Sequence, residues 1–273
     1  MFTDKNTEEV IHTKIWQEEP EPDNPFVAKK CYCAGYDVYG DLLGKASWAE
    51  YLFLLFKLEK PAQDQAKLLE TIAIAIANPG IRDHSVRAAM NAGVGGSTSA
   101  SALIAALAVG AGQLGGAREV YLMMQSWEDC IQDLDKWKNR IQNPPKLTLP
   151  DSWPEIKHPI GFDPNSESCS APVLQTLSEL ISCSKGASLH WLKENRNALE
   201  EYSGCPLAMT SVAAFAFEDI GFNPEQGEML YLLMRLPGAA AHAIEQKHNG
   251  WRKYPFFADS LEIMNDPHAR DGI

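Results

Sequence analysis

The stretch GAGQLGGAREVYLMM, Gly110–Met124, places four glycines inside a chain that otherwise has a helical pattern. Glycine adopts backbone conformations that other residues avoid, and it lets a backbone approach another group closely. The stretch carries no histidine, cysteine or serine, and its first carboxylate is Glu119. An amphipathic pattern begins at Ala117. We therefore predict a glycine turn that opens a helix, with reactive side chains supplied from elsewhere.

Helical patterns extend on both sides of this turn. Ser47 and Glu50 have the spacing of a capping box ahead of an apolar helix, and Pro61 opens the next helical segment. A proline-rich stretch over 144–164 predicts a loop or crossover. The remaining helices are expected over 84–109, 117–142, 171–184, 186–202, 206–220, 224–234 and 237–249. Alternation with a period of two is nearly absent, which predicts an all-α fold.

Composition limits the classes of partner. The chain has 273 residues, 45% of them hydrophobic and 22% charged, as is typical of a globular protein. Its net charge of −12 disfavours duplex nucleic acid and anionic membranes as partners, because both attract a basic face. Residues 1–25 are polar and acidic and predict a loose leader without a secretory signal. No membrane span and no metal site are expected, and the six cysteines are interpreted as reduced thiols of a cytoplasmic protein.

Several stretches, in order, resemble one family. LPGAAAHAIEQK (236–247) followed by WRKYPFF (251–257) resembles the end of citrate synthases and citryl-CoA lyases. Gly-Gly-Ala at 115–117 resembles the family's glycine turn, and HPIGFDP (158–164) resembles its histidine loop. The resemblance covers about residues 34–257, and its further matches are AGYDVYGDLLGKASWAEYLFLLF (34–56), SVRAAMNAGVGG (85–96) and CPLAMTSVAAFAFEDIGF (205–222).

The resemblance implies a fold and an activity. The expected fold is a citrate-synthase-like homodimer, in which a large helical domain takes residues 26–117 and 212–273. A small domain, residues 118–211, would close over an acyl-CoA. The expected substrate is a coenzyme A thioester whose C–C bond is cleaved or formed, as in the short citryl-CoA lyases. No tightly bound cofactor is expected.

The family's chemistry uses three side chains, and two are replaced here. A carboxylate removes a proton from the thioester carbon, a histidine on the glycine turn stabilises the enol, and a second histidine polarises the acceptor ketone. The matching positions are Thr210, Leu114 and His158, so only His158 keeps its type. Each lost proton-transfer group costs a factor of about 10²–10⁴ in rate. Ordinary citrate synthesis should therefore be slow or absent.

Other residues are candidates for the site. Asn165 stands where the family's loop has an arginine. Arg252 matches an arginine that binds a carboxylate in the family; the alternative for Arg252 is a surface salt bridge or a cation–π contact. His84 follows Asp83 and is either a relocated base or an exposed residue at a helix start; Arg87 lies in the same segment as a candidate for substrate binding.

For His158 itself, a purely structural role in the loop remains the alternative. Glu155 and Asp163 flank it and are either catalytic or solvated. Two functions stay open at this point. The first is an enzyme with altered substrate or mechanism. The second is an inactive pseudoenzyme that binds a ligand, or a non-catalytic subunit in a hetero-oligomer with an active paralogue.

Overall fold

The computed structural model describes residues 12–144 and 158–255. The chain forms two compact units, Met1–Glu70 and Thr71–Ile273, which we describe separately. The predicted domain boundaries at 117/118 and 211/212 both fall inside the larger unit, whereas the predicted large domain (26–117 with 212–273) includes residues of both units. That division stays a prediction.

The first unit contains a small antiparallel sheet that the sequence pattern did not predict. Its strands are β1 (Gln17–Glu21), β2 (Asn24–Cys33) and β3 (Tyr36–Asp37), in the order β1-β2-β3. Gln17 pairs with Tyr32, and Cys33 pairs with Tyr36. Part of the expected loose leader is therefore a hairpin. Every residue of β1 is exposed, so no buried face produced an alternating pattern to read.

The sheet leads into the helical part of this unit. A π-helical turn, η1 (Val38–Leu42), precedes α1 (Trp48–Lys57). The capping box predicted at Ser47 and Glu50 is present, with hydrogen bonds in both directions. Cys33, Leu42 and Leu54 form a buried cluster that joins β2, η1 and α1. Helix α2 (Gln63–Ile76) follows and spans the boundary between the two units.

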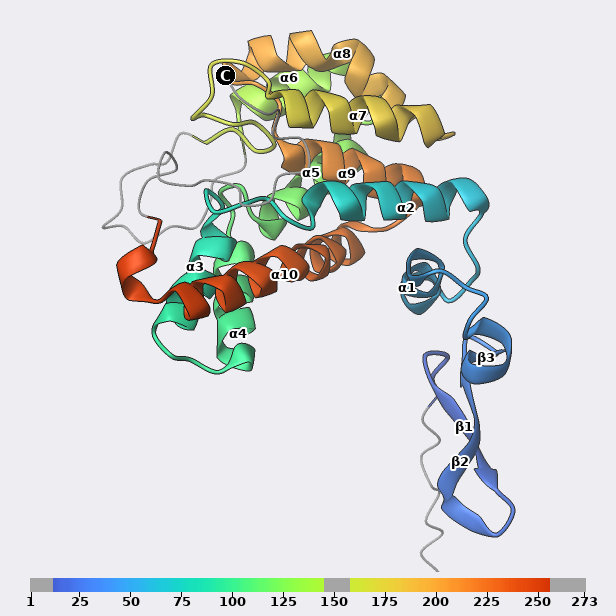
Figure 1. Ribbon diagram of the computed structural model, residues 1–273. Helices are drawn as coiled ribbons and strands as arrows, with labels where there is room; N and C mark the ends of the chain where they lie inside the picture. Colours follow the sequence, from blue (N-terminus) through green and yellow to red (C-terminus); the bar gives the residue numbers. More distant parts are fainter. Residues whose placement is uncertain (1–11, 145–157, 256–273) are drawn as a thin grey trace, which may run out of the picture. The chain divides into compact units, whose positions relative to one another are not determined.

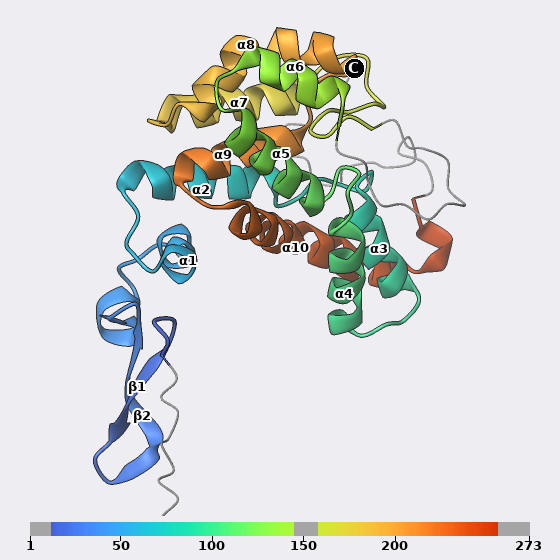
Figure 2. The ribbon, with the colours of Figure 1, turned by 180° about the vertical axis from the view of Figure 1, so that it is seen from behind.

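The larger unit consists of helices in two groups (Figure 1). Helices α3, α4 and α10 pack together, and α6, α7 and α8 lie on the other side of α5 and α9, as the reverse view in Figure 2 also shows. The bounds are α3 (His84–Val94), α4 (Ser99–Gly110), α5 (Ala117–Cys130), α6 (Leu134–Gln142), α7 (Ala171–Cys183), α8 (Ser188–Ser203), α9 (Met209–Ile220), α10 (Pro224–Asn249) and a 3-10 turn, η2 (Trp251–Lys253).

Three expected helix boundaries were wrong. The block 84–109 is two helices, because the chain turns after Gly95 and restarts at Thr98, whose side chain caps α4. The block 117–142 also divides, and Asp133 caps α6. In contrast, the helices expected over 224–234 and 237–249 are one continuous helix through Pro237. We predicted a break at Pro237 because proline removes a helical hydrogen bond. Packing against the neighbouring helices keeps α10 continuous there.

Small residues allow α3, α4 and α10 to pack closely. Their shared core contains Val86, Ala89, Met90, Ala102, Ala106, Ala239 and Ala243. A Cβ atom on Gly93 would collide with the carbonyl oxygen of Ala243, so α3 meets α10 backbone to backbone. These small residues thus give α3, α4 and α10 a closely packed shared core. Within the described residues, no helix is long and apolar enough to cross a membrane.

Candidate functional site

A cavity of about 780 Å³, which we call the site cavity, lies within the larger unit. Its wall is built from the segment before α3, the glycine turn, the loop that begins at His158, the segment before α9, and α10. It brings together six candidates singled out from the sequence: His84, Leu114, His158, Asp163, Asn165 and Thr210. The lining segments are more than 100 residues apart in the sequence, so only the folded chain brings these residues together.

A buried carboxylate holds His158. Glu119 lies in the first turn of α5 with no exposed surface, and its Oε1 atom is 2.9 Å from His158 Nε2. The same oxygen accepts a hydrogen bond of 2.6 Å from the backbone N–H of Gly161. Its second oxygen accepts one of 2.8 Å from the N–H of Gly115 in the glycine turn. A single side chain therefore ties the turn to the histidine loop.

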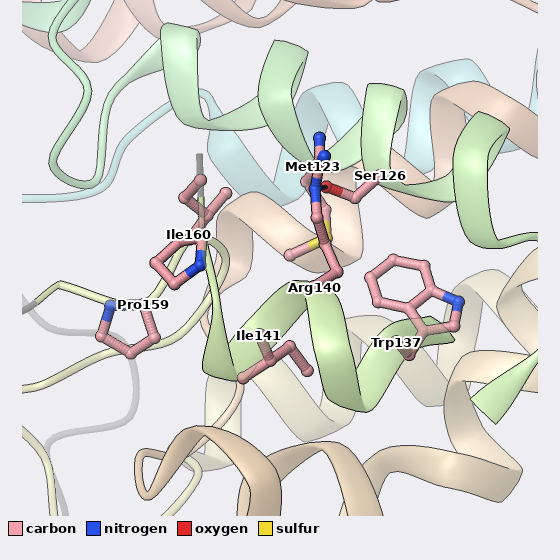
Figure 3. A pocket seen from close by; sticks show the side chains of 8 residues that line it. Met123, Ser126, Trp137, Arg140, Ile141, Pro159 and Ile160 are labelled. Atoms are coloured by element: carbon pink, nitrogen blue, oxygen red, sulfur yellow. Dashed lines mark hydrogen bonds between the residues drawn. The ribbon is translucent and has the colours of Figure 1, made fainter. Parts of the chain in front are cut away.

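The loop after His158 is anchored on both of its flanks. Pro159 and Ile160 lie beside Met123, Arg140 and Ile141 around a cavity of about 20 Å³, as Figure 3 shows. A space of this size holds about one water molecule. The loop cannot shift toward α5 or α6 without displacing these side chains.

Gly161 fixes the other flank. Its carbonyl oxygen accepts hydrogen bonds from Ala208 N–H at 3.0 Å and Ser211 Oγ at 2.6 Å. Its φ of +85° is a conformation that glycine tolerates, and a Cβ there would collide with Met123 and Ser211. The backbone of the histidine loop is thus joined to α9 without a side chain at this position.

An ion pair forms another part of the cavity wall. Arg235, on α10, is buried and pairs with Asp83, the residue that caps α3. Its Nη1 atom donates to the Tyr231 hydroxyl at 3.0 Å and to the Gly115 carbonyl at 3.4 Å. Burial raises the pKa of Tyr231, so this hydroxyl stays protonated. Within the described residues, the Nε atom of Arg235 is buried without a hydrogen-bond partner.

Comparison with known proteins rests on structure alone. No family model and no curated protein matches the sequence. A citryl-CoA lyase from Hydrogenobacter thermophilus superposes with a TM-score of 0.70 and 16% identity, over 95% of this chain and 96% of that one. A mutant ATP citrate lyase from Methanosaeta concilii, in complex with (3S)-citryl-CoA, gives 0.70 and 15%, over 94% of this chain and 42% of that one.

A third structure extends the likeness. A citrate synthase from Thermoplasma acidophilum, in a ternary complex with carboxymethyl coenzyme A and oxaloacetate, superposes with a TM-score of 0.54 and 20% identity. It covers 74% of this chain and 53% of that one. The chain has the citrate-synthase-like fold. It spans nearly the whole of the citryl-CoA lyase, but less than half of the ATP citrate lyase chain.

Leu114 and Thr210, which the sequence resemblance matched to family catalytic positions, both line the site cavity. Leu114 is 42% exposed, at the point where the glycine turn meets the cavity. Thr210 is buried in the first turn of α9, and its Oγ1 atom has no hydrogen-bond partner among the described residues. Neither side chain moves a proton near neutral pH. Glu119 and His158, which also line the cavity, are the carboxylate and imidazole that contact each other there.

Asp163, the carboxylate in the histidine loop, has a structural role in that loop. Asp163 accepts hydrogen bonds from the Asn165 N–H at 2.9 Å and from Ser166 Oγ at 2.6 Å. Burial opposes its ionisation, but these hydrogen bonds outweigh burial and lower the pKa of Asp163. The Asp163 side chain therefore shapes the loop that presents Asn165 to the cavity. Glu155 lies outside the described residues.

The remaining candidates lie apart from the Glu119–His158 pair. His84 is exposed on the cavity wall, and the carboxylate of Asp83 turns to Arg235, Ser85 and Val86 instead of pairing with it. Arg87 and Arg252 are exposed and are not among the described residues that line the cavity. Substrate binding by these two arginines stays a prediction.

Sequence reasoning missed Glu119 and Arg235 as site residues. Each carried a readable signal. Glu119 is the first carboxylate after the glycine turn, and Arg235 is a lone charge in the apolar run LLMRLPG. A buried charge inside an apolar run normally needs a partner. No cluster of three His, Cys, Asp or Glu side chains suited to a metal ion occurs in the described parts of the chain.

Proposed function

We propose that this chain binds a coenzyme A thioester of a carboxylic acid in the site cavity and cleaves or forms a C–C bond next to the thioester. Cleavage of the citryl-CoA-lyase type is the favoured direction. The observation that carries the proposal is the pair formed by His158 and buried Glu119 at 2.9 Å, inside a cavity of the citrate-synthase-like fold. The substrate differs from plain citryl-CoA, because Leu114 and Thr210 offer different contacts.

The pair gives His158 a defined protonation pattern. Because the Glu119 carboxylate accepts hydrogen bonds, Nε2 of His158 carries the proton that faces it, and Nδ1 is left as the acceptor. During cleavage, His158 takes the proton of the substrate hydroxyl, and Glu119 stabilises the resulting imidazolium. The C–C bond breaks as the hydroxyl carbon becomes a carbonyl. The electron pair passes to the thioester enolate, which then takes up a proton.

Positive charge in the wall favours an acidic substrate. Arg82 is exposed and lines the site cavity. Buried Arg235 keeps a free Nε–H, although Asp83 neutralises much of its charge. Together with Asn165, these groups provide hydrogen-bond donors for a carboxylate. The chain's overall charge of −12 makes such local cations more necessary for an anionic ligand.

Thermal unfolding with ligands tests the proposal. The panel contains coenzyme A, acetyl-CoA, oxaloacetate, citryl-CoA and a series of 3-hydroxyacyl-CoA esters, measured with wild type, His158→Ala and Glu119→Gln. The matched control is His190→Ala, which removes an exposed histidine on α8. A ligand that binds the native state raises the melting temperature. We expect a shift with a CoA ester that the control keeps and His158→Ala loses. No shift with any compound would refute the proposal.

A non-catalytic role is the second candidate, and the replacement of two side chains by Leu114 and Thr210 favours it. In this case the chain binds a CoA ester without turnover, alone or beside an active paralogue. Cleavage of the bound ester into a shorter acyl-CoA and a carbonyl compound, measured by mass spectrometry, separates the candidates. Binding without cleavage identifies the non-catalytic protein. The double variant Leu114→His, Thr210→Asp should then gain measurable cleavage, because it returns a donor and a base to the cavity.

Assembly and location complete the proposal. We propose a homodimer, with a hetero-oligomer containing an active paralogue as the alternative. Light scattering after gel filtration distinguishes a monomer from a dimer of 30.2 kDa chains. All six cysteines are free thiols, which fits a reducing compartment such as the cytoplasm.

A further inference from the structure

A second cavity of about 610 Å³ lies behind the wall of the site cavity. The loop before α7 and the segment before α9 form this wall, because Ser166, Ser168 and Pro206 line both cavities. Arg196 and Glu200 of α8, which form an ion pair at 2.8 Å, also line the second cavity. Two thiols, Cys169 and Cys205, also line it.

The segments that carry these thiols are held against each other. Phe162 pairs with Leu207 in an antiparallel bridge, and the Asp163 N–H donates to the Pro206 carbonyl at 2.8 Å. At the other end of the loop, Cys169 Sγ lies 3.6 Å from the Leu207 carbonyl. Cys205 is only two residues before Leu207. Both thiols are partly exposed, so a small oxidant reaches them without unfolding of the chain.

We propose that Cys169 and Cys205 are a redox pair that a peroxide converts into a disulfide in the wall of the site cavity. One thiolate attacks hydrogen peroxide and becomes a sulfenic acid, with release of hydroxide, which takes up a proton to become water. The second thiol then attacks the sulfenic sulfur, the S–S bond forms, and a second water leaves. The two cysteines lose two electrons and two protons in total, and the peroxide is reduced to two waters.

The bond changes the site through its wall. It closes a loop that contains α7 and α8, and it fixes the segment over 166–169 to the segment over 205–208. Asn165 and Thr210, which line the site cavity, lie next to these segments. Oxidation therefore alters the wall of the site cavity without touching Glu119 or His158. This inference concerns the thiols alone and does not depend on the proposed function.

Peptide mapping tests the pair. The full-length protein is treated with hydrogen peroxide at pH 8, since burial beside Glu200 raises the pKa of Cys169 and only the thiolate reacts. Free thiols are blocked with N-ethylmaleimide, and the digest is analysed by mass spectrometry. We expect a peptide pair joined through Cys169 and Cys205, two free thiols fewer per chain, and reversal by dithiothreitol.

Three variants decide the assignment. Cys169→Ser and Cys205→Ser should each abolish the linked peptides. Cys183→Ser should keep them, because this partly exposed thiol on α7 donates to the Glu179 carbonyl and does not line the second cavity. Circular dichroism checks that each variant is folded. A linked pair that involves another cysteine, or oxidation of both thiols to sulfinic acid without a link, would overturn the proposal.

Discussion

One oxygen of Glu119 binds both the side chain of His158, at 2.9 Å, and the backbone N–H of Gly161, at 2.6 Å. The histidine and the loop that follows it are therefore positioned by the same atom, 39 residues earlier in the sequence. The loop cannot move without breaking a hydrogen bond to a fully buried carboxylate. The position of His158 is thus coupled to the start of α5.

Replacing Glu119 by glutamine should destabilise the protein. The amide keeps one acceptor oxygen, but its NH₂ group faces donors that the carboxylate had satisfied, such as the Gly115 N–H. A buried unsatisfied donor costs about 1–3 kcal/mol, so we expect a loss of about 2–4 kcal/mol in the free energy of unfolding. Urea denaturation measures it. Glu194→Gln, on the exposed side of α8, is the control and should change little. Equal stabilities would contradict the central role of Glu119.

Gly161→Ala should combine backbone strain with collision. Position 161 has a φ of +85°, and a Cβ there would meet Met123 and Ser211. Gly204→Ala is the matched control, because its φ is +69° and a Cβ would meet nothing within 4 Å. Backbone strain alone costs about 1 kcal/mol. We expect Gly161→Ala to cost about 2 kcal/mol more than Gly204→Ala in urea denaturation. Similar losses in the two variants would show that the crowding at 161 is relieved easily.

Stability should fall as the pH rises toward 8 because of Glu218. Burial, with Glu128 and Asp219 nearby, raises the pKa of Glu218 from 4.5 to about 8. The folded protein therefore keeps a proton that the unfolded chain releases above pH 4.5, so stability is fully present below pH 4.5 and declines up to about pH 8. A difference of one bound proton gives a slope of at most about 1.4 kcal/mol per pH unit. Glu218→Gln should flatten the curve in urea titrations from pH 5 to 8; a curve like that of wild type would exclude Glu218 as the cause.

Asp83→Asn should separate the ion pair from helix capping. Asparagine caps helices as well as aspartate does, but it cannot balance the charge of buried Arg235. Breaking such a pair leaves a buried charge, for which we expect a loss of about 3 kcal/mol. Asp133→Asn is the control, since Asp133 caps α6 through Asp135 and Lys136 N–H groups. Thermal unfolding of both variants compares them. A loss of equal size in the control would mean that capping, not the ion pair, accounts for the effect.

Helical periodicity and capping residues predicted most of the fold, because these signals are local. Ser47 and Glu50 formed the capping box that their spacing predicted. Local signals failed where distant packing decides. Pro237 reads as a helix end, but α10 continues through it, because α3, α4 and α5 pack along this helix. In the hairpin β1–β2, one-sided burial occurs only at the end of β2, at Cys31 and Cys33, so the sequence carries little of the alternation that marks a strand.

The site was only half predictable for a similar reason. The family resemblance marked His158, Leu114 and Thr210. The partners of these residues were hidden, because a pairing such as Glu119 with His158 joins segments that no local pattern connects. For Arg252 the opposite holds: the family motif marked it in the sequence, but it is not among the described residues that line the site cavity.

The continuity of α10 through Pro237 has a consequence for how variation is tolerated around the site. The N–H group of Gly238 donates to the carbonyl of Ala77 at 2.8 Å, and any Cβ at 238 would strike that carbonyl. The segment that leads to Arg82, Asp83 and His84 is therefore held by main-chain atoms. Substitutions along this segment can change the chemistry that faces the ligand while its path stays the same. Main-chain contacts thus keep the backbone of this segment in place, while its side chains are free to differ between related proteins.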